Sequence, residues 1–234
     1  MKIHNSEKRL QKFWGKVDEK HIRLIEEWVT GNHILDMGAG YGATTGYLSK
    51  KKDIHCVAMD CDPEMADKAK NIFPGINYVQ ANAEHLPFEA KTFDTIILRD
   101  ALHHFLAEAD IEKVKGEIAR VAKDQSRVIF FDPNVNWVLK SLRWLSNHKD
   151  EECHFEQALG IMQSMGFTII HKGFSTIFSL PLSGGYVGIN FVPNNKWIQN
   201  GILKTERFLE RKINSFHVQR NLFWRYIIVG EKRA

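Results

Sequence analysis

Short apolar runs alternate with segments of helical spacing through the first 130 residues of the chain. Strands that are apolar along their whole length, separated by helices, are typical of a parallel sheet that is covered on both faces. The pattern therefore predicts an α/β fold, with a doubly wound, mostly parallel sheet and helices on both of its faces. The apolar runs lie at 34–37, 54–59, 76–79, 95–98 and 128–131.

The last third of the chain departs from this alternation. Residues 167–173 and 222–230 are two further apolar runs, which brings the predicted strands to seven, but nearly fifty residues separate them. That distance is far longer than an ordinary connection. Apolar residues recur at helical intervals from Trp197 to Phe216, and five basic against two acidic residues give the segment 196–212 a net charge of +3. We expect one domain over 1–234, with a helical insert before its last strand.

Charge and cysteine content point to a cytoplasmic protein. Lysine and arginine number 32 and aspartate and glutamate 28, and the resulting net charge of +4 is too small to demand a nucleic-acid partner. The three cysteines form no Cys-x-x-Cys pair, which indicates a reducing compartment. The first 13 residues hold no apolar stretch, so no secretory signal is expected.

One uncharged segment, 174–192, needs checking as a membrane span. It contains Pro181 and several glycines, which make a poor spanning helix. We expect a strand followed by an apolar loop, with peripheral contact at the inner face of a membrane kept open.

A glycine-rich loop follows the first predicted strand. Gly38, Gly40 and Ala43 fit the spacing of a dinucleotide fingerprint, and Asp60, at the end of the second strand, lies 20 residues beyond Gly40. Glycines here let the chain turn sharply and let a ligand approach the backbone. The spacing alone fits either a nicotinamide cofactor or S-adenosylmethionine.

Asp36, two residues before Gly38, favours S-adenosyl-L-methionine as the cofactor. Its carboxylate would oppose the pyrophosphate of a dinucleotide, whereas the ammonium and sulfonium of S-adenosylmethionine are cationic. Asp60 suits the ribose hydroxyls of either cofactor. A nicotinamide-dependent oxidoreductase stays the alternative.

Four ordered motifs resemble those of class I S-adenosylmethionine-dependent methyltransferases. They lie at 36–42, 60–65, 83–88 and 93–105. The resemblance is closest to the group that contains the ubiquinone/menaquinone-biosynthesis C-methyltransferases, and it covers about residues 30–133. It implies a Rossmann-like fold and methyl transfer; a non-catalytic protein that binds S-adenosylmethionine is a further alternative.

The resemblance also implies which residues hold the cofactor. The methionine part would pack on the glycine loop, Asp60 would hold the ribose, and Cys61 and Met65 would flank the adenine. Asn82 stands where the family usually has Asp, and its amide still offers an acceptor to the adenine amine. Arg99 would meet the methionine carboxylate or the methyl acceptor. The expected cofactor residues are Asp36, Gly38, Ala39, Gly40, Asp60, Cys61, Met65, Asn82, Ala83, Glu84 and Arg99.

A proton must leave the methyl acceptor if that acceptor is a hydroxyl or a carbon acid. His104, His103 and His154 are the candidate bases, because imidazole titrates near neutrality, and His104 is the first choice. Two adjacent histidines without further ligands are weak evidence for a metal, so none is expected. Asp100 is expected to cap the helix that follows it rather than to hold a metal with Asp132.

Acceptor specificity is expected outside the cofactor core, in the segments 1–29, 134–155 and 174–220. Trp14, Trp137, Trp144 and Trp197 fall there, among basic residues. That combination suits an apolar acceptor with an anionic group, or a membrane surface. Packing between helices or a homodimer interface explains it equally well. We expect in-line methyl transfer to a small, apolar, lipid- or quinone-like acceptor, and no nucleic-acid partner.

Overall fold

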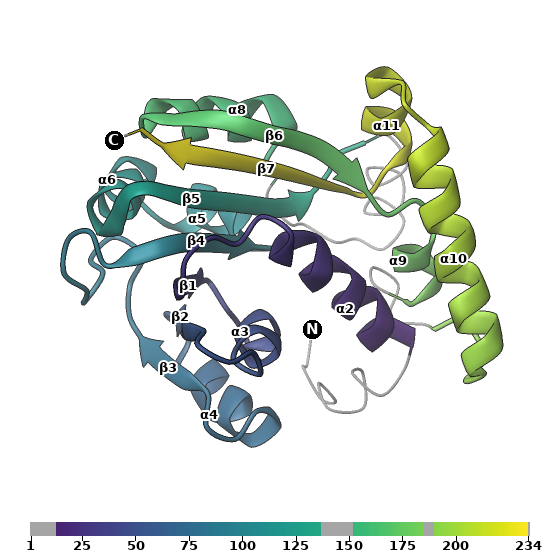
Figure 1. Cartoon of the computed structure of the whole chain (residues 1–234), viewed down its shortest axis with the longest axis horizontal. Helices are drawn as coiled ribbons and strands as arrows, with labels where there is room; N and C mark the ends of the chain where they lie inside the picture. Colours follow the sequence, from purple (N-terminus) through teal and green to yellow (C-terminus); the bar gives the residue numbers. More distant parts are fainter. Residues whose placement is uncertain (1–12, 137–151, 185–189, 234) are drawn as a thin grey trace. The chain divides into compact units, whose positions relative to one another are not determined.

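The computed structural model describes residues 13–136, 152–184 and 190–233 (Figure 1). They fall into two compact units, each built from several stretches of chain. The larger unit holds 25–133, 152–173 and 227–233; the smaller holds 13–24, 134–136, 174–184 and 190–226. All expected cofactor residues and all three candidate histidines lie in the larger unit. A single domain over the whole chain stays a prediction beside this division.

Seven strands form one sheet, in the order β3-β2-β1-β4-β5-β7-β6. They are β1 (His33–Met37), β2 (His55–Asp60), β3 (Asn77–Gln80), β4 (Phe93–Arg99), β5 (Ala122–Pro133), β6 (Phe167–Ser175) and β7 (Arg225–Lys232). β1 pairs in parallel with β2 and β4, β2 with β3, and β4 with β5. The strand order reverses between β1 and β4, which confirms the predicted Rossmann-like, doubly wound sheet.

Two helices of the larger unit, α4 and α6, begin at a side-chain cap. The Asp62 and Asp110 carboxylates accept N–H groups in the first turns of α4 and α6, and Pro63 follows Asp62 directly. Helices α3 and α4 lie against β2, and α5 and α6 against β5 (Figure 1). The bounds in this unit are α3 (Ala43–Leu48), α4 (Pro63–Ile72), α5 (Leu102–Glu108), α6 (Ile111–Val121) and α8 (Phe155–Ser164).

The core of the larger unit lies on the central strands. Ile34, Ile97, Ile129 and Val229, from β1, β4, β5 and β7, are fully buried and belong to one cluster. Because the central strands are apolar on both faces, helices must cover both faces of the sheet. A polar ligand can then bind only at the ends of the strands. In doubly wound sheets ligands bind at the carboxyl ends of the strands.

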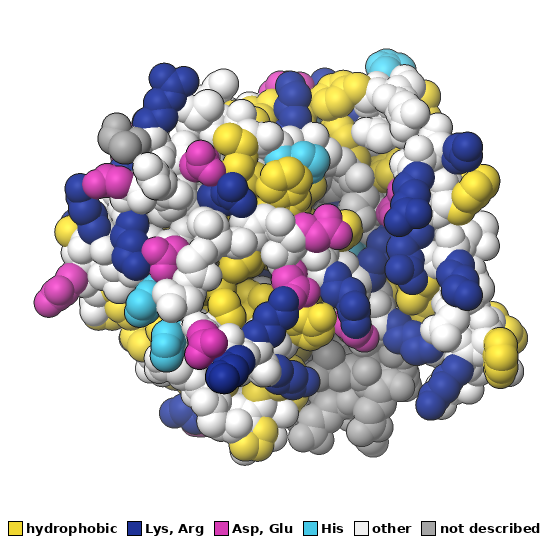
Figure 2. All heavy atoms as spheres, in the orientation of Figure 1, with side chains coloured by type: hydrophobic (Ala, Val, Ile, Leu, Met, Phe, Trp, Pro, Cys, Tyr) yellow, Lys and Arg dark blue, Asp and Glu magenta, His cyan; other side chains and the backbone are white. Residues whose placement is uncertain are grey.

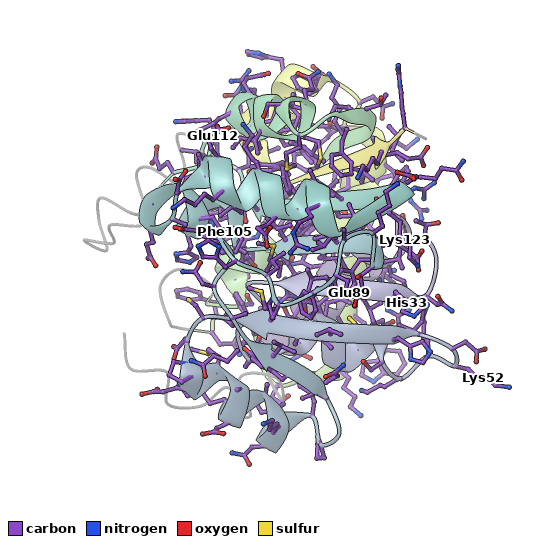
Figure 3. All side chains as sticks on the ribbon, turned by 90° about the vertical axis from the view of Figure 1, so that its left-hand side faces the viewer. His33, Lys52, Glu89, Phe105, Glu112 and Lys123 are labelled. Carbon is purple, nitrogen blue, oxygen red and sulfur yellow. The ribbon has the colours of Figure 1, made fainter. Side chains whose placement is uncertain are left out.

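Figure 3 shows the two ends of the sheet. His33 and Lys123, near the amino ends of β1 and β5, lie to the right, whereas Phe105 of α5, which follows the carboxyl end of β4, lies to the left. Asp94 ties the amino edge together: its carboxylate accepts from Lys123 Nζ at 2.8 Å and lies 3.4 Å from His33 Nδ1. The opposite, carboxyl edge carries the predicted cofactor residues.

The smaller unit has an apolar cluster of its own, and the predicted helical insert is present in it. Phe13, Val17, Leu180, Leu203 and Trp224 are buried together. The helices involved are α2 (Phe13–Glu26), whose first residues fall in this unit, α9 (Ser179–Leu182), α10 (Lys196–Lys212) and α11 (Phe216–Leu222). The loop predicted after β6 is wrong for 179–182, which form α9; residues 185–189 lie outside the described part of the chain.

A buried ionic cluster fastens α10 to α2. Lys20 Nζ donates to Glu206 at 2.6 Å and to Glu210 at 2.7 Å, and the Glu206 side chain is fully buried. Glu206 also accepts the N–H groups of residues 177–179 at 2.7–2.9 Å, so its side chain caps the amino end of α9. Burial alone would raise the pKa of Glu206, but Lys20 and the hydrogen bonds from Ser179 outweigh it and hold the pKa below its ordinary value.

Within the described ranges, no helix has both the length and the apolar character needed to cross a bilayer.

Candidate active site

The loop between β1 and α3 turns on two glycines in the left-handed conformation. Gly38 has φ 72° and Gly40 has φ 53°, values that residues with a Cβ rarely adopt. The N–H groups of Gly38 and Ala39 both donate to the carbonyl of Met59, at 2.8 and 2.9 Å. The loop is therefore held against the end of β2, next to Asp60.

The two glycines differ in their surroundings. A Cβ on Gly38 would lie 2.6 Å from the Cβ of Ala101 at the start of α5, whereas a Cβ on Gly40 would meet nothing within 4 Å. Gly38 is therefore required for packing inside the protein. The space beside Gly40 is open, so that a ligand could enter it and a side chain would occupy it; we call this space the cradle.

Asp60 joins the end of β2 to this loop. Its Oδ2 accepts the Gly40 N–H at 2.8 Å, and its Oδ1 accepts the Asp62 N–H at 3.0 Å. The Tyr78 hydroxyl, from β3, donates to the carbonyl of Gly40 at 2.7 Å. Burial, then the charge of Asp60, raises the pKa of Tyr78, so its hydroxyl stays protonated. Each Asp60 oxygen still has a lone pair for a ribose hydroxyl.

Asp36 lies buried at the end of β1. One of its oxygens accepts the Thr45 hydroxyl at 2.8 Å and the Thr45 N–H at 3.1 Å, in the first turn of α3. Burial raises the pKa of Asp36, and the Thr45 hydrogen bonds and the positive charge of Arg99 offset this only in part. A buried carboxylate of this kind is stabilised further by a cation that binds near it.

The Asp36→Asn variant should be more stable than the wild type without ligand, yet bind the cofactor less tightly. Because the pKa of Asp36 is higher in the folded than in the unfolded protein, protonated Asp36 favours the folded state at low pH. This stabilisation is lost as the pH rises from about 4 through the folded-state pKa. Asn carries no charge and can still accept from Thr45. Urea unfolding at several pH values should show a gain that grows toward neutral pH, and calorimetry should show about tenfold weaker S-adenosylmethionine binding. Equal affinity in the two proteins would contradict a role for the charge.

The residues expected around the adenine lie at the ends of β2 and β3. Cys61 is exposed as a whole residue, but partial burial of its thiol raises the pKa of that thiol, and the negative charge of Asp60 raises it further. Met65, on α4, is half-buried. Asn82 Oδ1 accepts the Glu84 N–H at 2.8 Å, which shapes the turn around the buried Ala83. The Glu84 carboxylate in turn accepts the Asp110 N–H at 2.8 Å, so it fixes the start of α6.

The expected cap of α5 is wrong. Asp132, fully buried near the end of β5, accepts the N–H groups of Ala101 at 3.1 Å and of His103 at 3.0 Å. The N-cap residue of α5 is Ala101, and its own side chain provides no cap. Asp100 instead takes a left-handed backbone conformation, with φ 55°. The helix is capped from the adjacent strand, and Asp132 is thereby committed to α5.

The three candidate bases differ in their surroundings. His103 is buried, with Nδ1 3.0 Å from Asp132 Oδ2, whereas the His104 side chain is 55% exposed; the two rings contact each other in a tilted arrangement, with centroids 4.2 Å apart. His154 precedes α8, and its ring lies 3.6 Å from Glu152. His103 is therefore held in place, and His104 is the accessible member of the pair.

Two residues that shape the site were not singled out from the sequence. Tyr78 lies in β3 near its carboxyl end, and that position was an available signal because ligands bind along this edge. Thr45 offered no such signal, since only the fold brings it to Asp36. Among the described residues, His154 is not in contact with either of the other two histidines.

A glycine loop after β1 and an acid at the end of β2, on a doubly wound sheet, define a nucleotide-binding domain of the Rossmann-like class. Residues 35–130 match the family described as a methyltransferase domain. This region of the chain is therefore similar to a methyltransferase domain, in line with the motif resemblance.

Curated relatives match over the same region. The uncharacterized methyltransferase YcgJ of Bacillus subtilis is 34% identical over 106 residues, 43% of this chain and 40% of that protein. Sarcosine/dimethylglycine N-methyltransferase of Aphanothece halophytica is 30% identical over 47% of this chain and 40% of its own length. The ubiquinone/menaquinone biosynthesis C-methyltransferase UbiE of Haemophilus ducreyi is 32% identical over 44% of this chain and 41% of its own length. The matches thus span about two-fifths of each relative.

The fold extends further than these matches. The crystal structure of YcgJ superposes on 92% of this chain and 99% of its own, with a TM-score of 0.61 and 20% identity. The two proteins therefore share their fold. Neither a nicotinamide oxidoreductase nor a non-catalytic binding protein finds support in these comparisons.

Proposed function

We propose that this protein binds S-adenosylmethionine at the glycine loop and transfers its methyl group to a small, largely apolar acceptor. The observation that carries the first part is the open cradle at Gly40, whose N–H binds the Asp60 carboxylate, with the Asp36 carboxyl close enough to Asp60 for the two to influence each other electrostatically. A pyrophosphate placed there would meet two negative charges, whereas an ammonium and a sulfonium would meet opposite charge.

The residues present fit this cofactor part by part. Asp60 would accept the ribose hydroxyls, Cys61 and Met65 would flank the adenine, and Arg99 would face the methionine carboxylate. When bound, S-adenosylmethionine supplies a methyl group that is already activated on a sulfonium. The protein's task is then to align the acceptor with that methyl group and to exclude water. Such orientation can lower a barrier by on the order of 7–11 kcal/mol.

The apolar residues of the segments where acceptor specificity is expected pack on one another in the smaller unit: Phe13 and Trp224 are buried in one cluster, and Trp14 packs against it. Trp197 is 88% exposed and does not belong to this cluster. Trp137 and Trp144 lie outside the described residues. The quinone-pathway relative is consistent with an apolar acceptor, and the sarcosine relative makes a small amine the acceptor class to test against it.

His104 is the proposed base, and its replacement tests the role. The His104→Ala variant should lower turnover at least tenfold with unchanged cofactor affinity, because a positioned base contributes about 10²-fold or more. Release of S-adenosylhomocysteine would be followed with a phenolic quinone precursor, an isoprenoid and sarcosine as acceptors.

The His55→Ala variant is the matched control, since His55 is exposed at the amino end of β2. Full turnover in His104→Ala, or an equal loss of turnover in both variants, would reject His104 as the catalytic base. Turnover with sarcosine alone would reject the apolar acceptor and keep methyl transfer.

A further inference from the structure

The large apolar side chains that stay exposed gather in one part of the chain. Eight such side chains occur among the described residues, and seven of them lie between 191 and 222. The most exposed are Trp197, at 88%, and Phe191 and Phe208, both at 59%. Bulky aromatic side chains concentrated in one segment are typical of an interaction surface rather than of scattered surface residues.

Trp197 and Phe208 project from the same side of α10. Eleven residues separate them, close to three helical turns, so they lie about 16 Å apart along the helix axis. Lys204 lies seven residues after Trp197 and four before Phe208, which places it on the same side. We call these residues, with the neighbouring Arg211 and Lys212, the outer face of α10; all five are exposed.

Both acidic residues of α10 point away from the outer face. The side chains of Glu206 and Glu210 are 0% and 15% exposed, and both bind Lys20. The basic residues of the helix are all exposed: Lys196, Lys204, Arg207, Arg211 and Lys212. The net charge of +3 for the segment therefore understates the positive charge on the exposed surface of α10. This surface carries five positive charges, and the only acidic side chain that reaches it in part is Glu210. Figure 2 shows Lys and Arg side chains along α10, at the right of the view, with hydrophobic side chains among them.

We propose that the outer face of α10 docks on an anionic lipid surface. Aromatic side chains between cations are what an interfacial helix presents: the rings enter the acyl boundary and the cations meet the lipid phosphates. A second copy bound through the same face would set like charges against each other. A nucleic-acid duplex offers phosphates but no apolar layer for two rings about 16 Å apart.

Co-sedimentation with vesicles tests this surface without any cofactor, so its outcome is independent of the methyl-transfer proposal. The wild type should bind phosphatidylcholine vesicles that contain about one-third phosphatidylglycerol, and pure phosphatidylcholine much less. Raising NaCl from about 0.05 to about 0.5 M should release it. The double variant Trp197→Ala/Phe208→Ala should bind at least about tenfold more weakly, and Lys204→Glu/Arg211→Glu at least about 25-fold. The vesicle-induced blue shift of tryptophan fluorescence should be lost in Trp197→Phe.

Matched controls lie in the larger unit. Ile170→Ala removes the one other large exposed apolar side chain of the described residues, and Lys50→Glu/Lys52→Glu reverses two exposed cations; both should bind like the wild type. Failure of the wild type to bind anionic vesicles, or equal losses in the controls, overturns the proposal. So does a dimer that Trp197→Ala/Phe208→Ala converts to monomers, or binding of a nucleic-acid duplex in place of vesicles.

Discussion

Alanine at Gly40 should leave the protein folded and remove most of its affinity for S-adenosylmethionine. The added Cβ meets no protein atom within 4 Å, so it would project into the cradle where the cofactor is expected to lie. The left-handed φ of 53° adds a stability cost of about 1–2 kcal/mol. The clash of the added methyl group with a bound ligand should weaken binding by about 3 kcal/mol, which corresponds to about 100-fold lower affinity. Calorimetry and urea unfolding on the same preparation measure both quantities.

Two other glycines serve as controls for this experiment. Gly38→Ala should cost about 3 kcal/mol of stability, because the new Cβ would lie 2.6 Å from Ala101 in addition to the strained φ. Gly116→Ala, at an exposed position in α6 with open space around it, should stabilise the protein by about 0.5–1 kcal/mol and leave affinity unchanged. Normal affinity in a folded Gly40→Ala protein would show that the cradle is not the cofactor site.

Replacing Lys20 by methionine should destabilise the protein by about 3–5 kcal/mol. The change leaves Glu206 buried without its cation, and removing one partner of a buried pair is far more costly than removing both. Because the pKa of Glu206 is held below its ordinary value, its contribution is present at neutral pH and is lost as the pH falls below about 4. Urea unfolding followed by tryptophan fluorescence measures the loss.

The double variant Lys20→Met/Glu206→Gln separates charge from packing. It should recover most of the stability lost in Lys20→Met, because the fully buried charge of Glu206 is gone and only the partly exposed Glu210 is left without its cation. Lys16→Met is the matched control on the same helix: Lys16 makes one exposed hydrogen bond, to Asn200, and its loss should change stability by less than about 0.5 kcal/mol. Equal effects at Lys16 and Lys20 would contradict the account of the buried cluster.

Features with a local cause could be predicted from the sequence. The short apolar runs gave seven strands, the glycine loop followed the first of them, and Asp62 with Pro63 marked the start of α4. Each of these depends on neighbours in the chain: burial of a short run, a turn that needs positive φ, or a cap within the first helical turn. The motif resemblance then supplied the class of domain.

Features that depend on distant parts of the chain could not be predicted. Asp132 caps α5 from a different strand, and Lys20 meets Glu206 across 186 residues. Thr45 lies only nine residues after Asp36, but the course of the glycine loop between them decides that their side chains meet. The direction in which a charged side chain points is also set by the fold: the charge count of the segment did not show that Glu206 and Glu210 turn toward Lys20, which leaves the outer face of α10 basic.

The central claim is that the site at the carboxyl ends of β1 and β2 binds a sulfonium nucleoside, and ligand binding to the wild-type protein tests it most directly. Titration calorimetry should show saturable binding of S-adenosylmethionine and of S-adenosylhomocysteine, none of NADH, and a large loss of affinity in Asp60→Ala. Binding of NADH without either of the other two ligands would contradict it.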